Sequence, residues 1–257
     1  MLEVIFAVLF GLIIGSFLNV VILRYQTGRT LAVRSGCLSC GKKFAWFELL
    51  PVLSFFVQTG RCRGCRSKIS WQYPLVELAT GIIFALVAWH FGVRQPADWL
   101  TTVFCWLVAS ILIVITVYDL KHQIIPDRFV FSLMFFGLIW SITHNLLVGL
   151  FGGLAMALPL LVLWLISRGR WLGFGDVKLV FALGLFLNWQ MGLSALVLAF
   201  WLGAIVGLLL IAWGKTRLWR KGKSYTMKSE VPFAPFLILG FWLVFFLSID
   251  VLAFWQI

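Results

Sequence analysis

Four of the five cysteines form two pairs with the spacing of a metal site. Cys37-x-x-Cys40 and Cys62-x-x-Cys65 each place two thiols on one turn, and 21 residues separate the pairs. Two such turns can complete the tetrahedral four-sulfur shell of structural Zn²⁺. Glycines at positions 41, 60 and 64 suit the tight turns of a zinc ribbon or knuckle. We therefore predict a zinc site at these cysteines, with two disulfides as the alternative.

Four acidic residues stand where polar segments meet long apolar runs. Asp119 ends an uncharged run, Asp127 precedes another, and Asp176 closes the motif Gly173-Phe174-Gly175-Asp176. Glu77 lies near the start of a further apolar segment. Two carboxylates held together at a partly dry site take different roles, because one keeps a proton while the other acts as a base. Such a pair can activate water against a peptide carbonyl.

Each of these acids also has a purely structural interpretation. Asp127 and Asp176 precede apolar segments, where an aspartate can cap the free N–H groups of a helix. Asp119 falls at a helix C-terminus, where the helix dipole disfavours a negative charge, so a structural role fits it less well. Glu77 could pair with a Lys or Arg. The sequence contains no Gly-x-Ser-x-Gly or His-Glu-x-x-His motif, so an aspartyl hydrolase is the favoured enzyme class.

The composition requires a membrane to position these residues. Of 257 residues, 62% are hydrophobic and 12% are charged, which excludes a disordered chain and disfavours a soluble globule. A spanning helix needs about 20 largely apolar residues. We predict an all-α polytopic membrane protein with about eight transmembrane helices, in the segments 4–23, 74–89, 99–118, 129–167 (two helices), 179–214 (two helices) and 231–249. Polar triplets divide the two long segments, at Thr143-His144-Asn145 and Asn188-Trp189-Gln190.

The basic residues test this count of helices. Twenty of the 21 Lys and Arg lie in loops that eight passes place on one side, namely 24–73, 119–128, 168–178 and 215–230, and Arg94 lies on the other. The positive-inside rule makes these loops cytoplasmic and both termini periplasmic. The asymmetry explains the net charge of +12 without a nucleic-acid partner and favours contact with anionic membrane lipid. A cytoplasmic loop also argues against disulfides, because thiols stay reduced there.

Three regions follow from this arrangement. Residues 1–23 form the first transmembrane helix, residues 24–73 a cytoplasmic zinc-ribbon-like domain, and residues 74–257 a seven-helix membrane domain. A loop of about 50 residues buries little core, so we expect the metal to supply part of its folding energy.

A series of motifs in this order resembles the type IV prepilin peptidases. They are Gly15-Ser16-Phe17-Leu18-Asn19-Val20, the two cysteine pairs, Pro51-Val52-Leu53-Ser54, Tyr73-Pro74-Leu75-Val76-Glu77, Asp119 through Asp127, Gly173 through Lys178, and Pro232-Phe233-Ala234-Pro235-Phe236-Leu237. The resemblance covers nearly the whole chain. It implies a GxGD aspartyl protease of the bacterial inner membrane, which cuts the basic leader from type IV prepilins or type II secretion pseudopilins at the cytoplasmic face.

The resemblance also assigns roles to residues. It implies that Asp119 and Asp176 are the catalytic pair. Ala234 stands where we expect glycine, a departure that could alter the flexibility of its loop. The residues that we expect to support the site are Gly173, Gly175, Asp127, Lys178, Pro235 and Glu77.

Family members that keep the four-cysteine loop also methylate the new N-terminal amine with S-adenosylmethionine. The complete cysteine set therefore predicts both activities, with Glu77 and the borders of the loop as candidates for holding the methyl donor. The alternatives are a peptidase whose zinc loop is only a scaffold and a non-enzymatic polytopic membrane scaffold. A zinc-ribbon nucleic-acid binder is less favoured than either.

Overall fold

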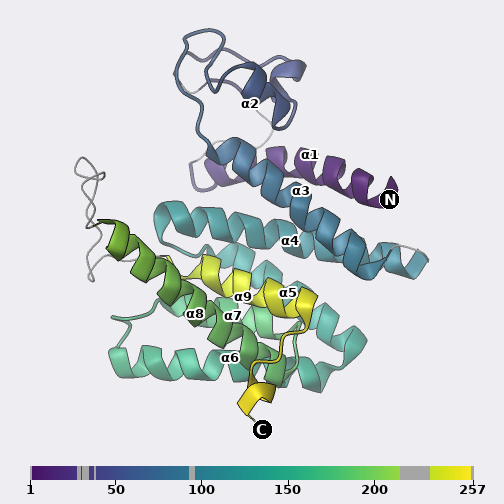
Figure 1. The fold of residues 1–257 in the computed structure, drawn as a ribbon, viewed down its shortest axis with the longest axis vertical. Coiled ribbons are helices and arrows are strands. Elements are labelled where there is room, and N and C mark those ends of the chain that lie inside the picture. The colour runs from purple at the N-terminus through teal and green to yellow at the C-terminus, as the bar shows by residue number, and fades with distance from the viewer. Residues whose placement is uncertain are drawn as a thin grey trace. The chain divides into compact units, whose positions relative to one another are not determined.

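A computed structural model describes residues 2–27, 30, 35–37, 39–92, 96–214 and 232–255 (Figure 1). The basic loop 215–230, Arg94 and Val231, all used in the sequence argument, lie outside these residues. The described residues contain helices and two isolated β-bridges but no β-strand. They divide into two compact units, residues 1–117 and 118–257.

Helices occur at each of the predicted apolar segments. They are α1 (Leu2–Arg24), α3 (Gln72–Phe91), α4 (Pro96–His122), α5 (Asp127–His144), α6 (Leu146–Ser167), α7 (Phe174–Gly184), α8 (Trp189–Gly214) and α9 (Ala234–Leu247). Shorter elements are η1 (Trp46–Leu49), α2 (Leu53–Val57) and η3 (Leu252–Trp255). Five helices, α1, α3, α4, α6 and α8, are long and apolar enough to cross a membrane. The all-helical membrane class is thus confirmed, whereas the count of eight passes stays a prediction.

Polar residues separate the helices within both long apolar segments, as predicted. α5 ends at His144, and the Asn145 side chain accepts the Val148 N–H at 3.2 Å to cap α6. The Asn188 side chain accepts the Met191 N–H at 2.8 Å just ahead of α8. Each asparagine satisfies an N–H group that the first turn of its helix leaves without a partner.

In the first unit, small residues bring α1 and α3 together. A Cβ atom added at Gly11 would lie 2.8 Å from Gly81 Cα, and one added at Gly15 would lie 2.7 Å from Glu77 Cα. Two glycines four residues apart form the small-residue stripe that lets membrane helices approach closely. The fully buried Asn19 of α1 donates to the Tyr73 carbonyl at 3.1 Å, near the start of α3. These contacts hold the two ends of the intervening loop side by side.

In the second unit, α7 forms the centre of the packing. It contacts α5, α6, α8 and α9, and its residues Leu179 and Leu183 are fully buried. The approach to α6 is so close that a Cβ at Gly152 would lie 2.1 Å from the Leu187 carbonyl oxygen. From α5, the Ser141 hydroxyl donates to the Leu185 carbonyl at 2.7 Å. The second half of α7 is therefore fixed by packing on several sides.

Candidate functional site

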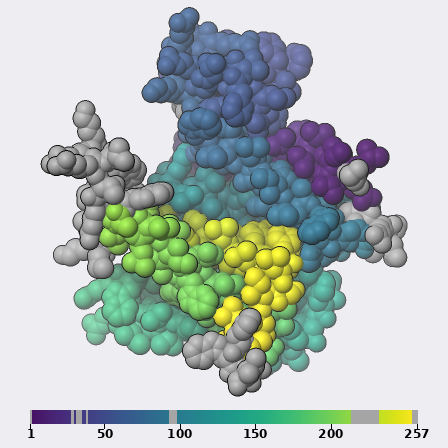
Figure 2. All heavy atoms as spheres, viewed as in Figure 1, coloured from purple at the N-terminus to yellow at the C-terminus, as the bar shows by residue number. Residues whose placement is uncertain are grey.

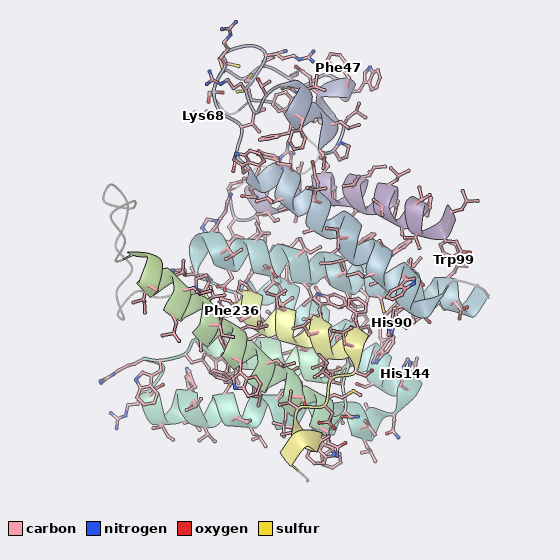
Figure 3. All side chains as sticks on the ribbon, viewed as in Figure 1. Phe47, Lys68, His90, Trp99, His144 and Phe236 are labelled. Atoms are coloured by element: carbon pink, nitrogen blue, oxygen red, sulfur yellow. The ribbon has the colours of Figure 1, made fainter. Side chains whose placement is uncertain are left out.

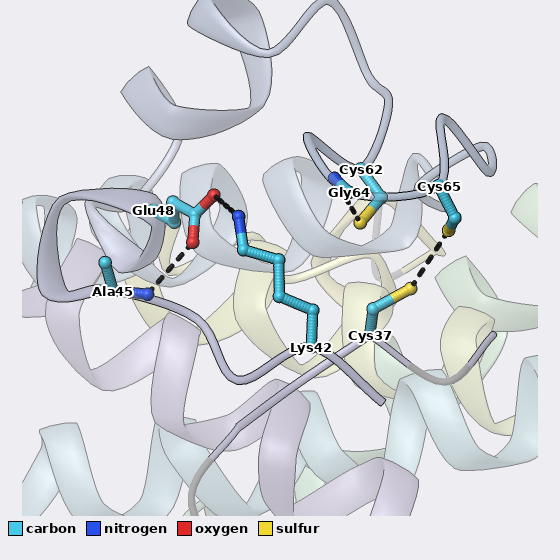
Figure 4. A network of polar contacts seen from close by, with 7 residues as sticks. All are labelled: Cys37, Lys42, Ala45, Glu48, Cys62, Gly64 and Cys65. Carbon is cyan, nitrogen blue, oxygen red and sulfur yellow. Dashed lines mark hydrogen bonds and ion pairs between the residues drawn. The ribbon is translucent and has the colours of Figure 1, made fainter. Parts of the chain in front are cut away.

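The four cysteines of the loop come together as one cluster. Their sulfur atoms all lie within 4.8 Å of one another, and the Sγ atoms of Cys37 and Cys65 are 3.8 Å apart (Figure 4). A tetrahedral zinc ion with Zn–S bonds of about 2.3 Å separates its sulfurs by about 3.8 Å. All four are free thiols. The donor set and its spacing fit a tetrahedral ion better than two disulfides.

The two cysteine turns repeat one backbone pattern. In the first, the Gly41 N–H donates to the Cys37 carbonyl and the Cys37 N–H to the Lys42 carbonyl, both at 2.9 Å. In the second, the Arg66 N–H donates to the Cys62 carbonyl and the Cys62 N–H to the Ser67 carbonyl, again at 2.9 Å. The residue in the left-handed region is Gly41 (φ +72°) in the first turn and Arg66 (φ +58°) in the second. The cysteine spacing alone does not reveal this repeat.

Ser67, which the cysteine spacing does not identify, contacts the cysteine cluster. Its hydroxyl oxygen lies 3.2 Å from Cys65 Sγ and 3.6 Å from Cys37 Sγ. Hydrogen bonding to Ser67 is the main cause that lowers the pKa of Cys37 to about 5. Ser67 therefore favours the thiolate of Cys37, which is the form that binds metal.

Glu48 is a second residue of the loop that spacing did not identify. Its buried carboxylate accepts the Ala45 N–H at 2.9 Å and pairs with Lys42 Nζ at 3.1 Å (Figure 4). The bond from Ala45, followed by that from Lys42, lowers the pKa of Glu48. The pair connects η1 to the first cysteine turn, so the cysteine cluster and the short helix belong to one compact part of the chain (Figure 2).

Glu77 binds the loop backbone where a Lys or Arg partner had been considered. It lies on α3, is 6% exposed, and accepts the Val52 N–H at 2.7 Å. No Lys or Arg pairs with it among the described residues. Val52 has φ +61°, unusual for a β-branched residue, and the Leu53 N–H closes a tight turn onto the Pro51 carbonyl at 2.6 Å. The buried carboxylate therefore holds a strained turn against the start of α3.

Asp119 in the second unit faces the beginning of another helix. It lies in the last turn of α4, is 5% exposed, and accepts the Ala234 N–H at 3.2 Å. Ala234 is the first residue of α9 and is fully buried, so this N–H has no partner within its own helix. Pro235, also buried, occupies an early position where its missing N–H costs nothing. A helix start thus offsets the unfavourable position of Asp119 at a helix end.

Asp176 lies in the first turn of α7, outside the five candidate spans. Burial, and then the negative charge of Asp119, raise the pKa of Asp176 to about 7. Gly173, and not Asp176, is the N-cap of α7. A Cβ at Gly175 would lie 3.2 Å from Ile125 Cβ, so a side chain there would crowd its neighbour. The charge of Asp119 is thus near enough to Asp176 to disfavour a second negative charge there.

The capping role considered for Asp127 is wrong. Pro126 is the N-cap of α5, and the Asp127 carboxylate instead forms an ion pair with Lys178 of α7. The Lys178 ammonium also lies 5.8 Å from the centre of the Phe131 ring and 5.6 Å from that of Phe174. The pair joins the first turn of α5 to α7 at a residue two positions beyond Asp176.

Comparison with known proteins assigns the chain to a family. Residues 9–91 match the Bacterial Peptidase A24 N-terminal domain, and residues 106–208 match the Type IV leader peptidase family. A Pseudomonas aeruginosa protein named "Prepilin leader peptidase/N-methyltransferase" is 31% identical, with 92% of this chain and 87% of that protein aligned. The chain belongs to the type IV leader peptidase family.

Two further proteins of the same name are similar in sequence to this chain. A Burkholderia pseudomallei protein of the same name is 32% identical over 93% of this chain and 84% of its own length. A Myxococcus xanthus protein, also of that name, is 36% identical over 80% of this chain and 63% of its own length. No solved structure matches the chain.

Proposed function

We propose that this family member is a bifunctional prepilin peptidase and N-methyltransferase. It removes the leader from type IV prepilins or from type II secretion pseudopilins and then methylates the new N-terminal amine. The observation that carries the proposal is the convergence of Asp119 and Asp176, from α4 and α7, in a chain of this family. The complete four-cysteine loop supports the second activity, because the curated relatives are named for both.

The surroundings of the two aspartates suggest separate roles. We assign the ionised form to Asp119, whose carboxylate accepts the Ala234 N–H and can deprotonate water. Asp176, whose pKa is raised to about 7, keeps a proton that it can donate to the scissile carbonyl oxygen. Water then adds to the carbonyl carbon as Asp119 takes its proton, and the C–N bond breaks when the amine nitrogen is protonated. Gly173, Gly175, Pro235 and the Asp127–Lys178 pair support this geometry.

The four cysteines hold Zn²⁺ as a structural ion in this proposal. Their sulfur spacing suits it, and the metal stabilises a loop with little core of its own. S-adenosylmethionine carries cationic groups that require oxygen acceptors. At the start of α3, Gln72 Oε1 is buried without a hydrogen-bond partner, near Asn19, and Glu77 supplies a buried carboxylate. These residues fit a cationic ligand, and the donor, when bound, supplies the methyl group.

The proposed setting is the bacterial inner membrane. Eight passes, in which α5, α9 and the part of α7 that begins at Leu179 join the five longer helices, put the four-cysteine loop in the cytoplasm and both termini in the periplasm. The basic loops support this orientation. The partners are the prepilin or pseudopilin substrate and membrane lipid, with no nucleic acid.

Mass spectrometry of one prepilin substrate tests the proposal. Detergent-purified wild type with S-adenosylmethionine should yield a product that has lost its leader and gained one methyl group. Asp119→Asn and Asp176→Asn should each lower cleavage by about 10²–10⁴-fold, the usual contribution of a general acid or base. Asp98→Asn, the same change in the first turn of α4 and thus at the other end of that helix from Asp119, should retain most cleavage. Full cleavage by a folded Asp119 or Asp176 variant would contradict the proposal. Leader loss without methylation by the wild type would show that the protein is a peptidase only.

A further inference from the structure

The four-cysteine loop carries a large exposed apolar surface that the proposed chemistry does not use. Eight bulky apolar side chains on η1, on α2 and next to them are between 41% and 77% exposed. We call them the aromatic surface: Trp46, Phe47, Leu49, Leu50, Leu53, Phe56, Val57 and Trp71. All but Trp71 fall within residues 46–57, and none lies in a candidate membrane span. Soluble surfaces rarely leave so many large apolar side chains together, so this face requires a partner.

On this face of the loop, an acidic side chain points inward and the apolar side chains point outward. Glu48 turns inward and is 7% exposed, whereas its neighbour Trp46 is 77% exposed. On α2, Phe55 alone fills the interior, and Leu53, Phe56 and Val57 point outward. Trp71 extends the same face, since its ring lies 6.5 Å from that of Phe56. An acid inside and aromatics outside suit a surface that faces an apolar medium.

The position of the surface favours the bilayer as that medium. Both ends of the loop continue into candidate spans, α1 and α3, so the loop is held at a membrane boundary. Figure 3 shows Phe47 on the side of the loop toward which α3 runs from its first turn to His90. Lys68 lies on the opposite side of the loop. Phe47 therefore lies on the side of the loop along which the spans extend, where a bilayer around them would lie.

The basic residues near the aromatic surface favour anionic lipid over neutral lipid. The guanidinium of Arg63 lies 5.3 Å from the centre of the Phe47 ring, and the exposed basic residues Lys42, Arg61 and Arg66 belong to the same loop. Aromatic side chains at headgroup depth with basic residues beside them are the signature of an interfacial anchor on an anionic leaflet. These basic residues would repel a basic prepilin leader.

We propose that the aromatic surface docks in the headgroup region of the cytoplasmic leaflet and anchors the four-cysteine loop to anionic lipid beside α1 and α3. The loop is then a peripheral membrane domain attached at three places, its two spanning helices and this surface. The inference rests on the proposed topology, in which the loop lies on the cytoplasmic side.

Photo-crosslinking from two positions tests the docking. The full-length protein carries p-benzoylphenylalanine at Phe47 or, as matched control, at the exposed Lys68, in nanodiscs of phosphatidylcholine with or without phosphatidylglycerol. After irradiation, mass spectrometry should find several-fold more lipid adducts from position 47 than from position 68, with phosphatidylglycerol enriched among them. Replacing Trp46, Leu53 and Val57 together by Ser should reduce these adducts, and the variant should still fold because all three side chains are exposed.

Two results would overturn the docking. One is equal lipid labelling from both positions, and the other is adducts formed at position 47 with added prepilin in place of lipid. Leader cleavage and methylation are measured in the same nanodiscs. Active enzyme without lipid adducts contradicts only the docking, whereas lipid adducts on a protein with neither activity contradict only the proposed function.

Discussion

The four-cysteine loop and the aspartate pair are built in contrasting ways. The cysteines lie on two short turns with the same hydrogen bonds, close together in the chain. Asp119 and Asp176 come from the end of one helix and the start of another, and a third helix supplies the Ala234 N–H. The loop thus depends on local turns and, in the proposed function, on a metal, whereas the pair depends on helix packing. The difference implies that either site can be damaged while the other still works.

The largest effect should come from removing a cysteine. Cys62 is 2% exposed within the cluster, and its loss leaves a three-sulfur site that cannot hold a structural metal well. Cys62→Ser should therefore abolish methylation while leader cleavage continues. The buried Cys105, changed to Ser, serves as the control, because it lies outside the cluster. Metal analysis and product mass spectra of both variants check this, and loss of both activities in a folded Cys62 variant would contradict the separation.

A second contrast is the response of the two activities to pH. With the pKa of Asp176 raised to about 7, the proton that it donates is present below that pH and lost above it. Cleavage should be level just below pH 7, decline at lower pH once Asp119 is itself protonated, and fall by about tenfold per pH unit above pH 7. Methylation requires a neutral amine, whose usual pKa is about 7.7–8.0, so methylation should rise over the same range. Parallel falls of both rates, measured with prepilin and with pre-cleaved pilin, would argue against Asp176 as the acid.

Helix packing should matter more to the aspartate pair than to the loop. A Cβ at Gly152 would meet the Leu187 carbonyl oxygen at 2.1 Å, whereas nothing lies within 4 Å of one at Gly207. Gly152→Ala should destabilise the protein by about 1–3 kcal/mol and reduce cleavage, because α7 carries Asp176. Gly207→Ala should be neutral or slightly stabilising. Thermal unfolding and cleavage assays compare the two variants, and equal behaviour would refute this account of the packing.

The smallest effect concerns the two cysteine turns. Gly41 and Arg66 occupy equivalent left-handed positions, which cost about 1–2 kcal/mol for a residue with a Cβ. Gly41→Ala should therefore weaken metal retention, and Arg66→Gly should leave it unchanged or slightly stronger. Competition with a chelator measures both. A weaker metal site in Arg66→Gly would show that the arginine side chain matters more than its backbone.

The sequence predicts the helices well because their signals are local. Apolar length locates α1, α3 and α4, and Asn145 and Asn188 mark the breaks that a hydropathy profile leaves ambiguous. Helix packing is harder to predict, since it depends on which small residues meet. Gly11 and Gly15 form a recognisable stripe, but their partner Gly81 becomes evident only in the fold.

Among the functional residues, too, local signals are predictable from the sequence and tertiary contacts are not. Cysteine spacing predicts the cluster, but Ser67 and Glu48 join it through contacts that spacing does not encode. Asp119 and Asp176 stand out as acids beside apolar runs, yet the Ala234 N–H and the Asp127–Lys178 pair depend on tertiary structure. The cap proposed for Asp127 failed for that reason, because a distant lysine competes for the carboxylate.

The most direct test of two separable sites supplies Asp176→Asn with a pilin whose leader has already been removed. This variant should methylate the pre-cleaved pilin at a rate close to that of the wild type and fail to cleave full-length prepilin. Mass spectrometry reads both reactions, and metal analysis confirms that the four-cysteine loop is intact. If the folded variant instead cleaves prepilin, or cannot methylate the pre-cleaved pilin, the assignment of the two activities to two regions is contradicted.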